Sequence, residues 1–256
     1  MKLIFIHGSG GWEGIWGKQL SYFPDAEAIT LPGHPDGELY KSVEEYANWL
    51  HQVIKYSGYK SVILAGHSLG GAIVMTYALK YPEGLSAIVL IGTGAKLRVH
   101  RQYISMLEEA VEGNLGRWVE WMKENYGSLP LEEQATLIEK HLEIGPLAQL
   151  NDLLCCDRFD IRERVHEIRV PTLVICGGQD TMTPTKFTNY LAEKIPGAKK
   201  VIIEGTTHHL FLEKPGEFNK ALDEFICNSH DFVHTTYYIA PVNNSGNLYF
   251  TSVSHR

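Results

Sequence analysis

The segment that most constrains the fold of this chain is a serine placed between a strand and a helix. The apolar run at residues 61–65 is followed by Gly66-His67-Ser68-Leu69-Gly70 and then by a helical stretch at 71–79. A sharp strand-to-helix turn of this kind exposes the central serine in a strained backbone conformation. Glycines on both sides let such a turn close without a clash, and the helix directs its first N–H groups toward whatever reacts there. The context predicts that Ser68 is a nucleophile rather than an ordinary turn residue.

Short apolar strands alternate with helices along most of the chain. The expected strands lie at residues 3–6, 26–30, 61–65, 87–91, 172–176 and 200–203. Most are continuous apolar runs, as expected where both faces of a parallel sheet are covered. The helix at 42–56 has one apolar face and begins with Ser42 and Glu45, the pattern of a capping box. Further helices are expected at 185–194 and 216–226. The alternation predicts an α/β fold with a mostly parallel open sheet.

One long segment, from about residue 96 to 167, contains no expected strand. Four helical patterns fill it, at 99–111, 115–126, 131–144 and 147–157. An all-helical insertion between the fourth and fifth strands would lie over the carboxyl ends of the strands, where ligands bind in open α/β sheets. The expected organisation is a core of residues 1–95 and 168–228, a helical cap of residues 96–167 and a tail of residues 229–256.

Two later loops supply candidate partners for Ser68. A serine hydroxyl needs a base that takes its proton and an acid that orients this base. Asp180 follows the fifth expected strand in a glycine-rich loop, although alone it would equally suit a turn or a helix N-cap. His208 follows the sixth strand, so the chain order is serine, acid, histidine. The adjacent His209 is the alternative base, but only one of the two can meet both the hydroxyl and Asp180, and we favour His208.

The loop after the first strand, His7-Gly8-Ser9-Gly10-Gly11, brings backbone N–H groups close to a substrate oxygen. The N–H of Leu69 would be a second donor to an oxyanion. Neither glycine-rich pattern of a nucleotide-binding loop is present. We expect no metal site, because the two adjacent histidines have no further ligands at suitable spacing, and no cofactor. His7 and His67 are interpreted as structural neighbours of the site.

Five segments together resemble the α/β-hydrolase superfamily. They are His7-Gly8-Ser9-Gly10-Gly11, Leu31-Pro32-Gly33-His34, Gly66-His67-Ser68-Leu69-Gly70-Gly71, residues 171–180 and residues 208–215. The resemblance runs from residue 1 to about 227 and is greatest to small carboxylesterases with a helical cap. It implies that Ser68 is the nucleophile, His208 the base and Asp180 the acid, and that the N–H groups of Ser9 and Leu69 form the oxyanion hole. The branches of the superfamily with an aspartate nucleophile are set aside because this chain has Ser68.

The tail is an addition to this pattern. Segments 235–239 and 248–253 favour strands, and residues 243–246 between them favour a turn, so we expect a C-terminal β-hairpin, with an unstructured tail as the alternative. Many members of the superfamily begin with two more strands, so the sheet edge near residues 26–30 would be bare. The hairpin would cover an edge or form a homodimer.

Bulk properties exclude several classes of function. A formal net charge of −7 argues against nucleic acid as a partner. No apolar run approaches the roughly 20 residues of a membrane helix, and the first glycine comes too early for a signal peptide. The four cysteines show no Cys-x-x-Cys spacing, which suits a reduced, cytoplasmic setting.

The cap carries the candidate substrate-binding residues. Among its large apolar side chains, Trp118, Trp121 and Met122 are expected to contribute to an apolar pocket above Ser68 that suits a short or medium acyl chain. Arg98 and Arg101, at the root of the cap, form either a solvated helix start or a site for an anionic leaving group, such as the phosphates of an acyl thioester.

These features predict a serine carboxylesterase that acts on small acyl esters through an acyl-enzyme. The first alternative is a thioesterase or acyltransferase that uses a phosphate-bearing thioester. The second, from a different class, is a ligand-binding protein without catalysis, since fold does not determine function. Lyases and perhydrolases that use the same triad also remain open.

Overall fold

The computed structural model describes the backbone of residues 1–233 and the side chains of residues 1–228. Both strands of the expected C-terminal hairpin, and with them the edge cover or homodimer contact, lie outside the described residues. Helix α10 (Pro215–Val233) is longer than expected and includes the first residues assigned to the tail. Within the described part of the chain, no helix is long and apolar enough to cross a membrane.

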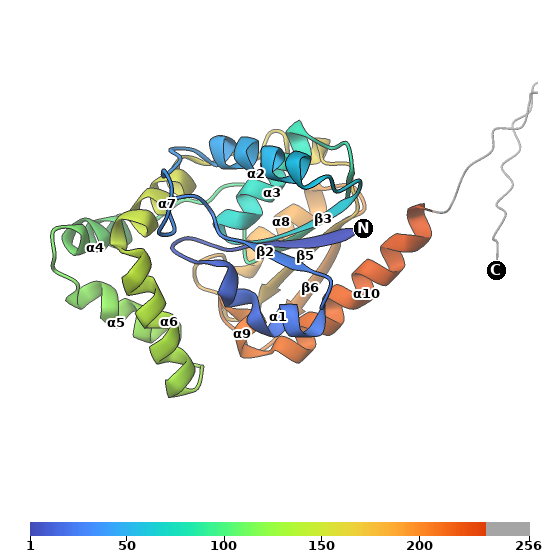
Figure 1. Cartoon of the computed structure of the whole chain (residues 1–256). Coiled ribbons are helices and arrows are strands. Elements are labelled where there is room, and N and C mark those ends of the chain that lie inside the picture. Colours follow the sequence, from blue (N-terminus) through green and yellow to red (C-terminus); the bar gives the residue numbers. More distant parts are fainter. Residues whose placement is uncertain (234–256) are drawn as a thin grey trace, which may run out of the picture.

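A six-stranded sheet forms the centre of the molecule (Figure 1), with the strand order β2-β1-β3-β4-β5-β6. Its strands are β1 (Lys2–Ile6), β2 (Glu27–Ile29), β3 (Val62–His67), β4 (Leu85–Ile91), β5 (Thr172–Gly177) and β6 (Lys199–Ile203). All neighbouring strands of this sheet are parallel. The arrangement confirms the expected α/β class and brings all six carboxyl ends to one edge.

Apolar side chains of the strands alternate between two cores, one on each face of the sheet. Ile4 and Leu64 belong to the core with α2 and α3, whereas Phe5 and Ile63 belong to the core on the side of α1, α9 and α10. The helices of the two layers are α2 (Val43–Ser57), α3 (Leu69–Lys80), α8 (Thr185–Lys194), α1 (Gly17–Tyr22) and α9 (Leu210–Glu213), with short 3₁₀ helices η1 (Glu13–Trp16) and η2 (Val165–Glu167). Burial on both faces explains why the strands are apolar without interruption.

Four helices connect β4 to β5 and lie together beside the sheet (Figure 1). They are α4 (Arg101–Val111), α5 (Gly116–Asn125), α6 (Leu131–Ile144) and α7 (Pro146–Arg158). Met106, Trp118 and Met122 are buried between them in the core that continues under the sheet. Helix α7 packs against α3, and its Cys155 and Cys156 join the opposite core. The insertion is therefore anchored to both apolar layers.

Helix α2 begins as expected, with one difference in its capping. The N–H of Glu45 donates to the Ser42 hydroxyl at 3.2 Å, which satisfies one of the free N–H groups of the first turn. The Glu45 carboxylate accepts from the N–H of Lys41 rather than from Ser42. The pair caps the helix, but not as the reciprocal box that the spacing predicts.

The turn from β3 into α3 depends on glycines that pack directly against backbone. A Cβ at Gly66 would overlap the carbonyl group of Gly70, and a Cβ at Gly70 would lie 2.5 Å from the carbonyl oxygen of Ile6. Between them, Ser68 has a φ of 52° and is the one non-glycine residue with a positive φ in the described part of the chain. Larger residues at either glycine would push the helix away from the strand and release the serine.

A pair of glycine substitutions tests this packing. We expect Gly66→Ala to lower the free energy of unfolding by at least about 2–3 kcal/mol, because its methyl group meets backbone that cannot move aside. Gly17→Ala is the matched control, because Gly17 already has helical angles and a Cβ there meets nothing within 4 Å. It should raise stability by about 0.4–1 kcal/mol. Urea unfolding followed by circular dichroism measures both, and equal stability of Gly66→Ala and wild type would contradict the packing argument.

Candidate active site

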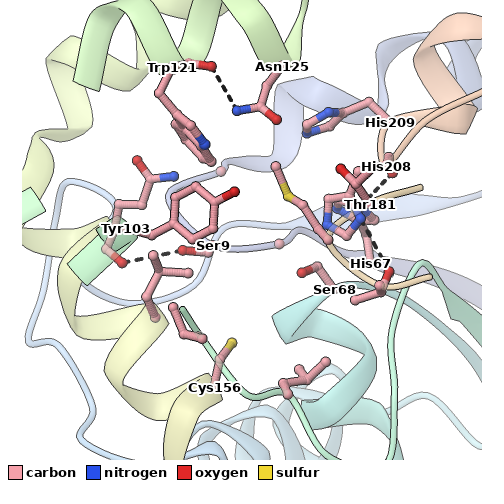
Figure 2. A pocket seen from close by; sticks show the side chains of 18 of the residues that line it. Ser9, His67, Ser68, Tyr103, Trp121, Asn125, Cys156, Thr181, His208 and His209 are labelled. Atoms are coloured by element: carbon pink, nitrogen blue, oxygen red, sulfur yellow. Dashed lines mark hydrogen bonds between the residues drawn. The ribbon is translucent and has the colours of Figure 1, made fainter. Parts of the chain in front are cut away.

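A pocket of about 350 Å³ lies at the carboxyl ends of the strands and contains Ser68 (Figure 2). The loop after β1 and the turn after β3 line one part of it, and the loops after β5 and β6 line another. Helices α4 to α7 of the insertion contribute the rest. Segments that are far apart in the sequence therefore meet at one site, as the parallel topology requires.

The backbone of Ser68 is held by contacts from three elements. Its N–H donates to the carbonyl of Ile91 in β4 at 2.9 Å, and its own carbonyl accepts from the Thr93 hydroxyl at 2.8 Å. The N–H of Gly71 in α3 also donates to this carbonyl at 3.0 Å. The Ser68 side chain does not cap α3, although it occupies the capping position. Its hydroxyl is left on the pocket side, where a nucleophile is expected (Figure 2).

Asp180 and His208 form a buried pair in the same pocket region. His208 Nδ1 lies 2.8 Å from Asp180 Oδ2. Asp180 also accepts hydrogen bonds from the N–H groups of Met182 and Thr183 and from the Thr183 hydroxyl, all between 2.7 and 2.8 Å. Burial opposes ionisation of Asp180, but His208 and these donors outweigh it, so the pKa of the carboxyl lies well below its usual range. An ionised Asp180 can only accept, so the hydrogen between the two groups is assigned to His208 Nδ1, and Nε2 is not used by the pair.

Two further histidines surround His208. His67 is fully buried, and its Nε2 lies 3.1 Å from the carbonyl oxygen of His208. Burial, reinforced by His208 and His209, lowers the pKa of His67 well below its usual value, so the ring is neutral and donates this hydrogen bond. His209 also lines the pocket, and its ring packs against Tyr126 with the centroids 4.7 Å apart. Asp180 pairs with His208, and His209 is part of the wall.

The loop after β1 passes directly beside Ser68. A Cβ at Gly8 would lie 2.8 Å from His67 Nδ1 and 3.2 Å from the Cβ of Ser68. In this loop the N–H of Gly10 is taken by a carboxylate and that of Gly11 by the carbonyl of Gly8. The N–H of Ser9 has no protein acceptor among the residues described.

The second expected donor is on the other side of the serine. Leu69 is the first residue of α3, so its N–H has no acceptor within the helix. The free N–H of Leu69 adjoins Ser68 in the chain, and that of Ser9 belongs to the loop that packs against Ser68. An oxyanion hole needs two such free donors.

The structure separates the expected substrate-binding residues into two groups. Trp121 and Arg98 line the pocket. Trp118 and Met122 do not, and for them the expectation is wrong: both are fully buried, and the Trp118 indole donates to Gln149 Oε1 at 2.6 Å. Arg101 is also absent from the lining, because its side chain is exposed and pairs with Glu108 at 3.2 Å. Lone sequence positions could not reveal which face of α4 or α5 meets the pocket.

Several pocket residues carry no signal in the sequence. They include Tyr103, Asn125, Gln149, Leu153, Met182 and Phe187. Thr183 also lines the pocket, and the sequence gives a partial signal for it, because it follows Asp180 in a loop rich in turn residues. Among the described residues, no group of three or more histidine, cysteine, aspartate or glutamate side chains could hold a metal ion.

The lowered pKa of Asp180 predicts how stability depends on pH. The ionised carboxylate stabilises the folded state above its unfolded pKa of about 3.9, and this contribution is lost as the pH falls through the lower folded pKa. We therefore expect the difference in melting temperature between wild type and Asp180→Asn to be largest near neutral pH and to shrink below about pH 4. Differential scanning calorimetry measures it, with the exposed Asp36→Asn as the control. A difference that stays constant with pH would contradict the assignment of charge.

Comparisons with known proteins agree with this geometry. A model of the alpha/beta hydrolase family matches residues 3–221. The putative carbamate hydrolase RutD of Escherichia coli O9:H4 (strain HS) is 25% identical over 240 residues, which cover 86% of this chain and 89% of that protein. A solved structure of a thermophilic esterase is 34% identical with a TM-score of 0.77, covering 89% of this chain and 90% of that one. The enol-lactonase from Burkholderia xenovorans LB400, at 16% identity and a TM-score of 0.80, covers 88% and 91% and is alike in fold.

The family match extends from β1 into α10 and includes every loop that contributes to the pocket. The esterase at 34% identity covers nearly the same length. Both findings agree with the parallel sheet and with the serine on the turn after β3. The chain is a hydrolase and belongs to the alpha/beta hydrolase family.

Proposed function

We propose that this hydrolase cleaves carboxylic esters through an acyl-enzyme on Ser68, with His208 as the base and Asp180 as the acid that orients it. The observation that carries the proposal is the hydrogen bond between Asp180 and His208 Nδ1 in the pocket that also contains Ser68. An ionised, buried acid on Nδ1 keeps the imidazole in the tautomer that accepts a proton on Nε2, and it stabilises the imidazolium that then forms.

The proposed reaction has two stages. In the first, His208 Nε2 takes the hydroxyl proton as Ser68 Oγ bonds to the ester carbonyl carbon, and the oxyanion accepts hydrogen bonds from the N–H groups of Ser9 and Leu69. The bond to the alcohol oxygen then breaks, and His208 gives the proton to the departing alkoxide. In the second stage, a water molecule attacks the acyl carbon with His208 again as base, which releases the acid and restores Ser68.

The size and lining of the pocket support small substrates. Its volume of about 350 Å³ is near the lower end of the roughly 300–1,000 Å³ typical of ligand sites. Leu153, Met182 and Phe187 give it apolar surface for a short or medium acyl chain. The relative at 34% identity is described as an esterase, which supports ester cleavage. The more distant RutD is described as a putative carbamate hydrolase, and carbamates share the carbonyl carbon that Ser68 would attack.

The first test is the nucleophile. Ser68→Ala should lower kcat for p-nitrophenyl butyrate by about 10⁴- to 10⁶-fold, as expected when a triad loses its serine. Stopped-flow release of p-nitrophenol measures this, and wild type should show a burst equal to the enzyme concentration if deacylation is slower than acylation. Thr136→Ala, on the exposed face of α6, is the control and should keep full activity. A Ser68→Ala variant that hydrolyses the ester at the wild-type rate would favour a ligand-binding role for this fold.

The thioester alternative depends on the basic segment at the root of the insertion. Lys96 pairs with Asp160, and Arg101 pairs with Glu108. Arg98 lines the pocket and has no carboxylate partner among the described residues. Most of the expected positive charge is thus neutralised locally, which favours a neutral ester over a phosphate-bearing thioester.

Arg98 and Arg101 form a matched pair for testing this alternative. Arg98→Ala should raise KM for a phosphate-bearing acyl thioester by about two- to fivefold, the effect of one exposed charge pair, and leave KM for p-nitrophenyl butyrate unchanged. Arg101→Ala should change neither, because Glu108 already holds that guanidinium. Steady-state kinetics with both substrates measures the difference. Equal KM values for the thioester in both variants would remove Arg98 as an anion site.

A further inference from the structure

A fully buried carboxylate of the insertion joins three separate segments of the core. Asp152 of α7 is fully buried and does not line the pocket. Its Oδ2 accepts from the N–H of Gly10, in the loop after β1, at 2.8 Å and lies 2.8 Å from Nε2 of His34. Its Oδ1 accepts a longer hydrogen bond of 3.4 Å from the Tyr46 hydroxyl of α2. A fully buried carboxylate with this set of partners is costly unless its charge is balanced.

The hydrogen bonds of His34 define the charge of this cluster. Its Nδ1 lies 3.1 Å and 3.2 Å from the carbonyl oxygens of Leu31 and Pro32, which can only accept, so Nδ1 carries a hydrogen. Its Nε2 faces Asp152 Oδ2, which already accepts from Gly10. Nε2 and Oδ2 share one hydrogen, which lies on the imidazole because an imidazole is more basic than a carboxylate, so the pair is an imidazolium and a carboxylate.

The charges of the neighbouring groups agree with this assignment. Burial opposes protonation of His34, but Asp152 and the two carbonyl groups outweigh it and raise the pKa of His34 above its usual value. The adjacent His7 ring, 4.9 Å away between centroids, is neutral, because burial and the charge of His34 lower its pKa to about 3. Its Nε2 accepts from the N–H of Leu31. The cluster therefore holds one positive and one negative charge.

Helix α7 holds the loop after β1 at two points. Asp152 binds the N–H of Gly10, and the Ser9 hydroxyl donates to the carbonyl of Gln149, one helical turn earlier, at 3.4 Å. Gly10 has a φ of 67°, and a Cβ there would lie 3.0 Å from the Gln149 side chain. The loop is thus in close contact with α7 at Ser9 and Gly10, directly after the peptide that carries the free N–H of Ser9. A shift of α7 would move this N–H relative to Ser68.

We propose that Asp152, with His34, is a positioning residue that holds the Ser9 N–H of the oxyanion hole in place from the helical insertion. The proposal rests on the proposed function, because an oxyanion forms only if Ser68 attacks a carbonyl carbon. If the proposal is correct, stabilisation of the transition state depends on the contact of α7 with the loop after β1. A merely structural role would lower stability or the amount of active enzyme and would leave selectivity between substrates unchanged.

Asp152→Asn breaks this cluster with almost no change in shape. An amide oxygen in the place of Oδ2 can accept from Gly10, but it leaves the charge of His34 unbalanced. An amide nitrogen in that place can donate to a neutral His34, but it loses the N–H of Gly10. Asp152→Asn/His34→Gln restores a neutral network, because the glutamine amide can donate to the same asparagine oxygen that accepts from Gly10. Tyr46→Phe is the control, since it removes the third partner and leaves Gly10 untouched.

The readout is the ratio of kcat/KM for an ester to kcat/KM for the thionoester of the same acid and alcohol. Sulfur in place of the carbonyl oxygen is larger and a weaker acceptor, so the thionoester draws less on the N–H groups of the oxyanion hole. The ratio cancels the concentration of active enzyme and is therefore insensitive to loss of folded protein. Asp152→Asn should lower kcat for the ester by about 10²- to 10³-fold, the effect of losing one oxyanion donor, and lower the ratio at least tenfold.

In Asp152→Asn/His34→Gln the ratio of ester to thionoester kcat/KM should return close to the wild-type value. In Tyr46→Phe the ratio should equal that of wild type. If Asp152→Asn does not yield folded protein, His34→Gln alone, which keeps a donor to Asp152 but removes the positive charge, should lower the ratio in the same direction. A ratio within twofold of wild type in Asp152→Asn, or in His34→Gln where that replaces it, would overturn the positioning role. Absence of ester hydrolysis that depends on Ser68 in wild type would instead overturn the proposed function.

Discussion

Ser68 has a φ of 52° and a ψ of −113°, a backbone conformation that costs a residue with a side chain about 1–3 kcal/mol. The neighbouring structure holds it there. The β4 carbonyl of Ile91 accepts from its N–H, and Thr93 and Gly71 donate to its carbonyl. Gly66 and Gly70 let β3, α3 and the loop after β1 approach until backbone touches backbone. The same conformation that strains the serine keeps its hydroxyl off the helix N-terminus and in the pocket.

The parallel sheet places the remaining groups around this serine. Loops after β1, β5 and β6 leave the same edge, so the glycine-rich loop, Asp180 and His208 reach the pocket without any long excursion of the chain. The helical insertion contributes differently. It lines the pocket through Trp121 and Gln149, and Asp152, which is not part of the lining, connects it to the loop after β1. A helix that lines a pocket and also binds the backbone of another loop of that pocket can influence the geometry of the site as well as access to it.

Much of this arrangement could be predicted from the sequence, because its signals are local. Continuous apolar runs indicated the six strands, and loops at strand ends indicated that Ser68, Asp180 and His208 would lie near one another. The residues of the insertion were harder to predict. Trp118 and Trp121 are three positions apart on α5, yet one is buried among the helices and the other lines the pocket. Which face of a helix contacts which neighbour depends on how the helices pack together, and the sequence of one helix alone does not determine it.

Among the residues whose side chains the structure describes, two buried pairs join a carboxylate to an imidazole, and the second ring nitrogen distinguishes them. In both pairs the distance from nitrogen to oxygen is 2.8 Å. His208 uses Nδ1 for Asp180, which leaves Nε2 available on a ring that lines the pocket, as the proposed mechanism requires. His34 uses Nε2 for Asp152, while Nδ1 is bound by carbonyl groups that can only accept, so its proton has nowhere to go. In the proposed mechanism, the same two functional groups therefore make a base in one place and a fixed cation in the other. The pair of Asp152 and His34 binds the N–H of Gly10. In our proposal it thereby holds the neighbouring Ser9 N–H in place for the reaction at Ser68.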